Sequence, residues 1–246
     1  MRRSGMKRFY DKNRLGFALC WIGVYCVGMS VFDELSRMIG IESICAAAFG
    51  LAVSLGLFFW LKSSGLLAEY GLSGLKINRQ VIWLYIPLII ITSQNLWGGF
   101  ALRYDALGTV CFVLKMLSVG FLEELIFRGF LFTAMARDNV KTAAFVSSLT
   151  FGLGHIINLL NGSGMGLWEN AVQIICAVLI GFLYLVLFRR GGSLWPCVLS
   201  HGILNALSAF SAGGESLPRI ALLCLLTVGY TLLLLKKLPE KDRVSP

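Results

Sequence analysis

The sequence has little charge. Only 14% of its 246 residues are charged, while 57% are hydrophobic and the mean hydropathy is +0.77. A soluble domain usually carries about 25% charged residues. The composition therefore excludes an ordinary soluble domain. It predicts an integral membrane protein with an all-α fold, a polytopic bundle of transmembrane helices.

Patterns for disulfides and for familiar metal sites are also missing. The seven cysteines all lie in apolar runs, and no two of them form a CxxC pair. They are interpreted as small buried hydrophobic residues. The chain has only two histidines and no HExxH motif, which excludes a zincin-type helix with two histidine ligands.

Acidic residues are fewer than basic ones, 13 against 22, and the formal net charge is +9. Most of the basic residues lie in the tails and in the connections between apolar runs, which is the orientation signal of a membrane protein. We therefore expect the lipid bilayer as a partner and no nucleic acid.

Eight apolar runs are each close to the ~20 residues that cross a bilayer as a helix. With both termini placed in the cytoplasm, most Lys and Arg residues of the tails and connections fall on that side, as the positive-inside rule requires. The basic head is interpreted as the flank of a retained anchor and not of a cleaved signal peptide. The predicted spans are residues 15–32, 43–61, 81–100, 109–136, 142–160, 168–188, 194–212 and 218–235.

The segment FLEELIFR, residues 121–128, places three ionisable side chains inside the fourth run. Each costs roughly 2.5–3.5 kcal/mol at the centre of a membrane helix. Glu124 and Arg128 are four residues apart, so they share a helix face and can form an ion pair. Glu123 is rotated by about 100° and can point into a cavity. The competing interpretation is a polar cluster that only locks helices together.

Two later runs carry the histidines. Phe151 and His155 share one helix face, and His201 shares a face with Asn205. Each pair alone could be an interhelical hydrogen-bonding group. The expected depths of Glu123, His155, His201 and Asn205 nevertheless permit one polar cluster in the cytoplasmic half of the membrane or near its middle.

In order along the chain, these residues form the patterns EExxxR (Glu123, Glu124, Arg128), FxxxH (Phe151, His155) and HxxxN (His201, Asn205). Together they resemble the CAAX protease and bacteriocin-processing (CPBP, or Abi) family of intramembrane proteases. The flanking segments SSLTFGLGHIINL and GGSLWPCVLSHGILN are similar to it as well. The resemblance covers roughly residues 110–210, and it divides the chain into an N-terminal three-span region (1–108), a catalytic core (109–212) and a last span with a basic cytoplasmic tail (213–246).

The resemblance implies hydrolysis of a peptide bond without an acyl-enzyme. Glu123 and His155 would activate the attacking water, and His201 and Asn205 would stabilise the oxyanion. Glu124, Arg128 and Phe151 would support the shape of the site. No cofactor is then expected, the substrate is a peptide or a membrane protein, and the short loops suit a bacterial cytoplasmic membrane protein.

Three alternatives stay open at this point. Glu123, His155 and His201 could bind a catalytic zinc, with one coordination position left for water. Cys197 lies four residues before His201 and could be a thiolate nucleophile. The chain could also be a non-enzymatic membrane scaffold or immunity protein that uses the polar cluster to specify helix packing.

Overall fold

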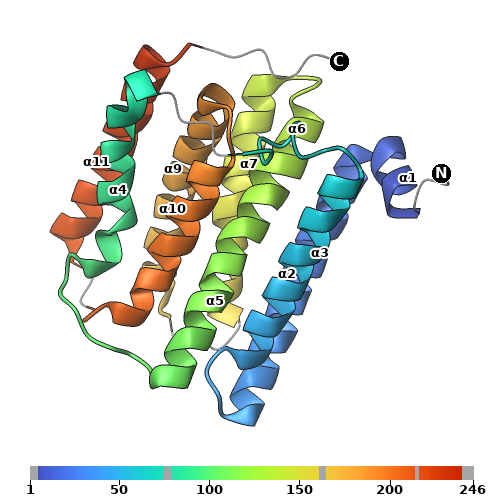
Figure 1. Cartoon of the computed structure of the whole chain (residues 1–246). Helices are drawn as coiled ribbons and strands as arrows, with labels where there is room; N and C mark the ends of the chain where they lie inside the picture. Colours follow the sequence, from blue (N-terminus) through green and yellow to red (C-terminus); the bar gives the residue numbers. More distant parts are fainter. Residues whose placement is uncertain (1–4, 75–78, 161–164, 214–215, 240–246) are drawn as a thin grey trace.

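The chain folds into a helical bundle in the computed structural model, which describes residues 5–74, 79–160, 165–213 and 216–239 (Figure 1). Within these ranges the only β-type pairing is an isolated bridge between Phe100 and Ser211. The α-helices are α1 (Gly5–Lys12), α2 (Arg14–Ile39), α3 (Ile44–Ser63), α4 (Ile86–Thr92), α5 (Ala106–Glu123), α6 (Phe132–Met135), α7 (Val140–Gly154), α8 (Ile157–Leu160), α9 (Leu167–Gly191), α10 (Trp195–Ala206) and α11 (Leu217–Lys237). The all-α class predicted from composition is confirmed.

Five helical stretches are long and apolar enough to cross a membrane: Arg14–Ile39, Ile44–Ser63, Val140–Leu159, Leu167–Gly191 and Leu217–Lys237. The chain is therefore an integral membrane protein. The predicted number of eight spans is close to the observed bundle but not exact, because three runs depart from a simple spanning helix.

Two of these three runs form shorter helices than expected. The run at 81–100 forms the 3-10 helix η1 (Arg79–Tyr85), α4 and the 3-10 turn η2 (Gln94–Leu96), and the run at 194–212 forms α10 followed by the 3-10 turn η4 (Leu207–Phe210). A 12-residue helix such as α10 is only about 18 Å long, short of the ~30 Å hydrocarbon core. The apolar composition of these two runs indicates that they avoid water, but it does not show that each crosses the whole membrane as one helix.

The third departure concerns the run at 109–136. It forms one helical rod from α5 to α6, but its middle part is the π-helix η3 (Glu124–Leu131), all of whose residues are buried. Short π-helical segments occur frequently at functional sites. Here the change from α to π geometry falls between the two adjacent glutamates.

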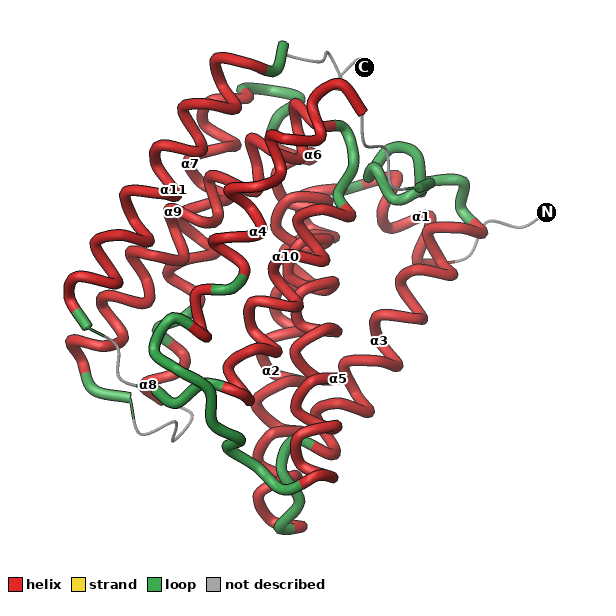
Figure 2. Tube along the Cα trace, turned by 60° about the vertical axis from the view of Figure 1, so that its left-hand side comes forward, coloured by secondary structure: helices red, strands yellow, loops and turns green. Residues whose placement is uncertain are grey.

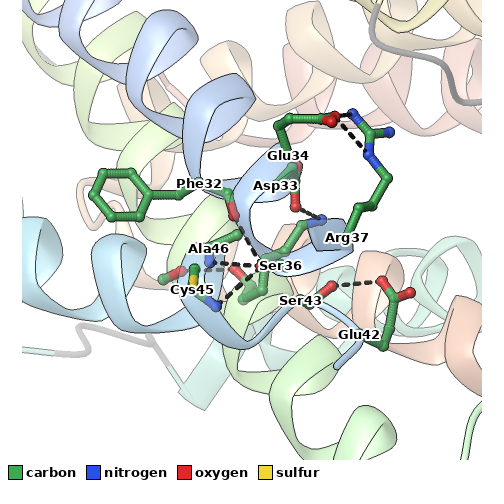
Figure 3. Close-up of polar contacts among 11 residues, drawn as sticks. Phe32, Asp33, Glu34, Ser36, Arg37, Glu42, Ser43, Cys45 and Ala46 are labelled. Atoms are coloured by element: carbon green, nitrogen blue, oxygen red, sulfur yellow. Dashed lines mark hydrogen bonds and ion pairs between the residues drawn. The ribbon is translucent and has the colours of Figure 1, made fainter. Parts of the chain in front are cut away.

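The hairpin of α2 and α3 is closed by Ser36 (Figure 3). Its hydroxyl donates to the carbonyl of Phe32 and accepts from the backbone N–H groups of Cys45 and Ala46, which lie at the start of α3. The hairpin packs against α5 and η3. A further ion pair joins α5 to α2, with Lys115 Nζ 2.6 Å from Asp33 Oδ1.

Basic residues gather at one end of the bundle. The start of α2, the end of α3, the start of α7 and the ends of α9 and α11 lie at the same end as α1 (Figure 1). Together they carry Arg14, Lys62, Lys141, Arg189, Arg190, Lys236 and Lys237. Arg2, Arg3, Lys76, Lys241 and Arg243, which also belong to the predicted charge pattern, lie outside the described residues. The division into regions 1–108, 109–212 and 213–246 stays a prediction.

Candidate active site

Close contact between α5 and α10 brings the predicted residues of two helices together. A Cβ atom built on Gly120 would lie 2.4 Å from the backbone nitrogen of Gly202 and 2.6 Å from its Cα. Only glycine therefore fits at position 120 in this crossing. Because Gly202 follows His201 directly, the same crossing places the His201 ring beside Glu123 and Glu124.

Glu124 and Arg128 form a fully buried ion pair, as the four-residue spacing predicts. Arg128 Nη1 lies 3.0 Å from Glu124 Oε1, and both side chains are 0% exposed. The guanidinium also lies over the Phe151 ring, 3.9 Å from its centroid, which is a cation–π contact. Gly181 on α9 leaves the room for it, since a Cβ there would lie 2.9 Å from Arg128 Nη2.

The guanidinium is held by charge and by the aromatic ring, because none of its nitrogens has hydrogen-bond geometry to an acceptor among the described residues. The Nη1–Oε1 contact is close enough for an ion pair, but it lacks the alignment of a hydrogen bond. Removing one partner of a buried pair costs roughly 3–5 kcal/mol, because the other charge stays buried and uncompensated.

His201 lies between the two glutamates. Its Nδ1 is 2.7 Å from Glu124 Oε1, and its Nε2 is 3.4 Å from Glu123 Oε2. The Nδ1 contact is a hydrogen bond, whereas the Nε2 contact is longer and lacks hydrogen-bond geometry. A carboxylate on one nitrogen of a histidine fixes the orientation and tautomer of the ring, which determines what the other nitrogen can do.

Glu123 is the accessible member of the acidic pair, with a side chain 13% exposed against 0% for Glu124. Its second oxygen, Oε1, accepts a hydrogen bond of 2.6 Å from the hydroxyl of Tyr25 on α2. Tyr25 belongs to no motif, so the sequence patterns did not predict its place in the site. The available signal is a phenol inside an apolar span, since a buried tyrosine hydroxyl usually finds a partner.

His155 lies close to the cluster but is not joined to the glutamates directly. It caps the carboxyl end of α7, and its Nδ1 lies 3.1 Å from the carbonyl oxygen of Phe151. The Phe151 ring stands edge-on to both histidines, with centroid distances of 5.2 Å to His155 and 5.7 Å to His201. In the described part of the chain no hydrogen bond or ion pair links His155 to Glu123. The Phe151 ring contacts both histidine rings.

Asn205 lies one turn after His201 on α10 and is partly buried. Its side-chain amide makes no hydrogen bond to any described residue. The structure thus groups Glu123, Glu124, Arg128 and His201 tightly. It places His155 against Phe151 and leaves the Asn205 amide without a partner among the described residues.

No set of three or more His, Cys, Asp and Glu side chains in the described residues has the spacing of a metal site. The proposed zinc ligands Glu123, His155 and His201 are thus not assembled as a three-ligand set in this conformation. Cys197 is fully buried, and its thiol donates to the carbonyl of Tyr184 at 3.3 Å. A nucleophilic thiolate needs a partly exposed setting, which the buried Cys197 does not have.

Comparison with protein families gives one match in this region. Residues 105–207 match the model described as "Type II CAAX prenyl endopeptidase Rce1-like". Neither the curated proteins nor the solved structures compared with the chain gave a match. The matched residues include α5, η3, α7 and α10, but not α2, which carries Tyr25.

Proposed function

We propose that this chain, whose residues 105–207 match the Rce1-like CAAX endopeptidase model, is an intramembrane endopeptidase acting on a peptide or a membrane-associated protein. The observation that supports this most directly is the contact of one histidine, His201, with two glutamates of different exposure. The Glu124 carboxylate is occupied by its contacts with Arg128 and His201. The Glu123 carboxylate is partly accessible and is therefore the one that can react with water.

In the proposed mechanism Glu123 is the general base. It accepts a proton from a water molecule, which His155 helps to orient, and the water oxygen attacks the carbonyl carbon of the scissile bond. Glu123 then returns the proton to the leaving amine. A positioned general base typically contributes 10²–10⁴-fold to the rate. If the Nδ1–H of His155 donates to the Phe151 carbonyl, Nε2 is left as an acceptor for the water.

His201 and Asn205 are the proposed donors to the oxyanion. This role requires the doubly protonated form of His201, in which Nδ1–H binds Glu124 and Nε2–H is available to the substrate oxygen. The Nε2 contact with Glu123, at 3.4 Å, is long enough to be exchanged for a shorter one. Loss of one such donor typically lowers kcat by about 10²–10³-fold.

The proposed chemistry uses no metal. The zinc alternative is tested by measuring the metal content of purified, active protein. A stoichiometric amount of zinc, with activity that is lost and regained together with it, would replace this mechanism.

We propose a bacterial cytoplasmic membrane as the location, with both termini in the cytoplasm. The gathering of basic residues at the end of the bundle that carries α1 supports this orientation.

The experiment that tests the function compares membrane peptides from cells that contain the wild type or Glu123→Gln. We expect the variant to insert at normal levels and to abolish at least one cleavage product. Glu34→Gln is the matched control, because Glu34 is an exposed glutamate that pairs with Arg37 on the surface. An identical set of products from Glu123→Gln and the wild type would contradict the proposed function.

A second comparison tests the substrate class. Purified protein in lipid nanodiscs is given a farnesylated peptide with a CAAX carboxyl terminus and the same peptide without the farnesyl group. We expect cleavage that does not require the prenyl group. Cleavage of the farnesylated peptide alone would instead assign a prenyl-protein substrate.

A further inference from the structure

The first long helix of the chain contributes a side chain to the site, although it lies outside the residues that match the family. Tyr25 on α2 donates a 2.6 Å hydrogen bond to Glu123 Oε1. A phenol is protonated at neutral pH, so it is the donor to a carboxylate in this contact. Donation to an ionised acceptor is stronger and shorter than a neutral hydrogen bond.

The two oxygens of Glu123 have different surroundings. Oε1 is held by Tyr25, and Oε2 faces His201 Nε2 at 3.4 Å. A glutamate carboxylate that makes no hydrogen bond to the protein can rotate about its last side-chain torsion, because that torsion has broad energy wells. With Tyr25 bound to Oε1, the carboxylate plane is set and Oε2 remains the oxygen that can accept a proton.

The position of Tyr25 is secured on both sides along α2. Eight residues before it, Phe17 packs edge-on against Phe130 of η3, with 5.1 Å between the ring centroids. Eight residues after it, Asp33 pairs with Lys115 of α5 at 2.6 Å. Each contact is about 12 Å from Tyr25 along the helix. Because both fasten α2 to the rod that carries Glu123, the register of the hydroxyl against the carboxylate is determined.

We propose that Tyr25 is a positioning residue that orients the Glu123 carboxylate, so that α2 completes an active site whose other residues come from 105–207. This inference rests on the proposed function, because it assigns Glu123 as the base. The alternative is a purely structural role, in which Tyr25 packs between helices and its hydrogen bond to Glu123 has no effect on catalysis.

The test uses Tyr25→Phe in the full-length protein, which removes the hydroxyl and keeps the ring. Tyr230→Phe is the control, because Tyr230 also lies in a long apolar helix and its hydroxyl has no hydrogen-bond partner in the described structure. The substrate is the peptide identified by the Glu123→Gln comparison. We expect Tyr25→Phe to lower kcat by on the order of tenfold or more, as loss of a hydrogen bond to a charged group does, with KM and the thermal midpoint unchanged.

An infrared measurement separates this inference from the proposed function. In protein with ¹³C-labelled glutamate, the difference between wild type and Glu123→Gln isolates the Glu123 carboxylate band. We expect that band to move in Tyr25→Phe and to stay in place in Tyr230→Phe. A band that moves in Tyr25→Phe, together with a wild-type protein that cleaves nothing, would support the contact while removing the proposed function.

Three results would overturn the inference. The first is a Glu123 band that is the same in Tyr25→Phe and the wild type. The second is an unchanged kcat despite a shifted band. The third is a fall in the thermal midpoint that accounts for the lost activity, which would assign Tyr25 a purely structural role.

Discussion

At the scale of single residues, the two adjacent glutamates have different environments. Glu124 is enclosed, with Arg128 at 3.0 Å and His201 at 2.7 Å. Glu123 keeps some exposure and contacts Tyr25 and the other nitrogen of His201. The stability of the bundle should therefore depend on Glu124, and its proposed catalysis on Glu123.

This difference predicts opposite outcomes for two conservative substitutions. Glu124→Gln leaves the Arg128 charge buried without a counter-ion, so we expect a loss of about 3–5 kcal/mol in unfolding free energy. Glu123→Gln removes an accessible carboxylate, and we expect a stability change of less than about 1 kcal/mol. Denaturant titration in detergent micelles measures both. Equal losses in the two variants would contradict the division of roles.

One contact of the candidate site could be predicted from residue spacing. The separation of four residues predicts the Glu124–Arg128 contact, because a helix brings such positions onto one face. Tyr25 could not be assigned in this way. Its contact with Glu123 joins residues 98 positions apart, and a single sequence contains no local signal for such a pairing.

At the scale of elements, the crossing of α5 and α10 holds the site together. Gly120 is the point of closest approach, and a side chain there would collide with the backbone of Gly202. Backbone atoms cannot move aside as the end of a flexible side chain can. The helices would have to separate, which would carry His201 away from Glu123 and Glu124.

We therefore expect Gly120→Ala to abolish the proposed activity and to destabilise the bundle by about 1–3 kcal/mol, the cost of overpacking. Gly229→Ala on α11 is the control, because a Cβ there meets nothing within 4 Å. Product formation and the thermal midpoint are measured for both variants. Wild-type behaviour of Gly120→Ala would mean that this crossing does not position the site.

At the scale of the whole molecule, the bundle has two chemically different ends. The turned view in Figure 2 shows α7, α9 and α11 running side by side toward one end, where Lys141, Arg189, Arg190, Lys236 and Lys237 lie. The opposite end holds Arg37 in the last turn of α2 and Arg103 before α5. In a membrane such a difference sets the orientation of the chain, because basic flanks are retained in the cytoplasm.

The orientation is checked with single cysteines in a variant without native cysteines. We expect Arg103→Cys to react with a membrane-impermeant maleimide on intact cells. Lys62→Cys, at the end of α3, should react only after the membrane is opened. The reverse pattern would invert the proposed topology and place both termini outside.

The sequence alone determined the membrane location, the all-α class and the segments that carry the polar motifs, because hydropathy and helical spacing are local properties of the chain. It also indicated a resemblance to the CPBP family, because three short motifs occur in the order found in that family. Only the tertiary structure decided that α10 is a short helix, that η3 has π geometry, and that His201 lies between two glutamates. It alone decided that Tyr25 reaches Glu123, because that contact depends on how the α2–α3 hairpin packs against α5 and η3.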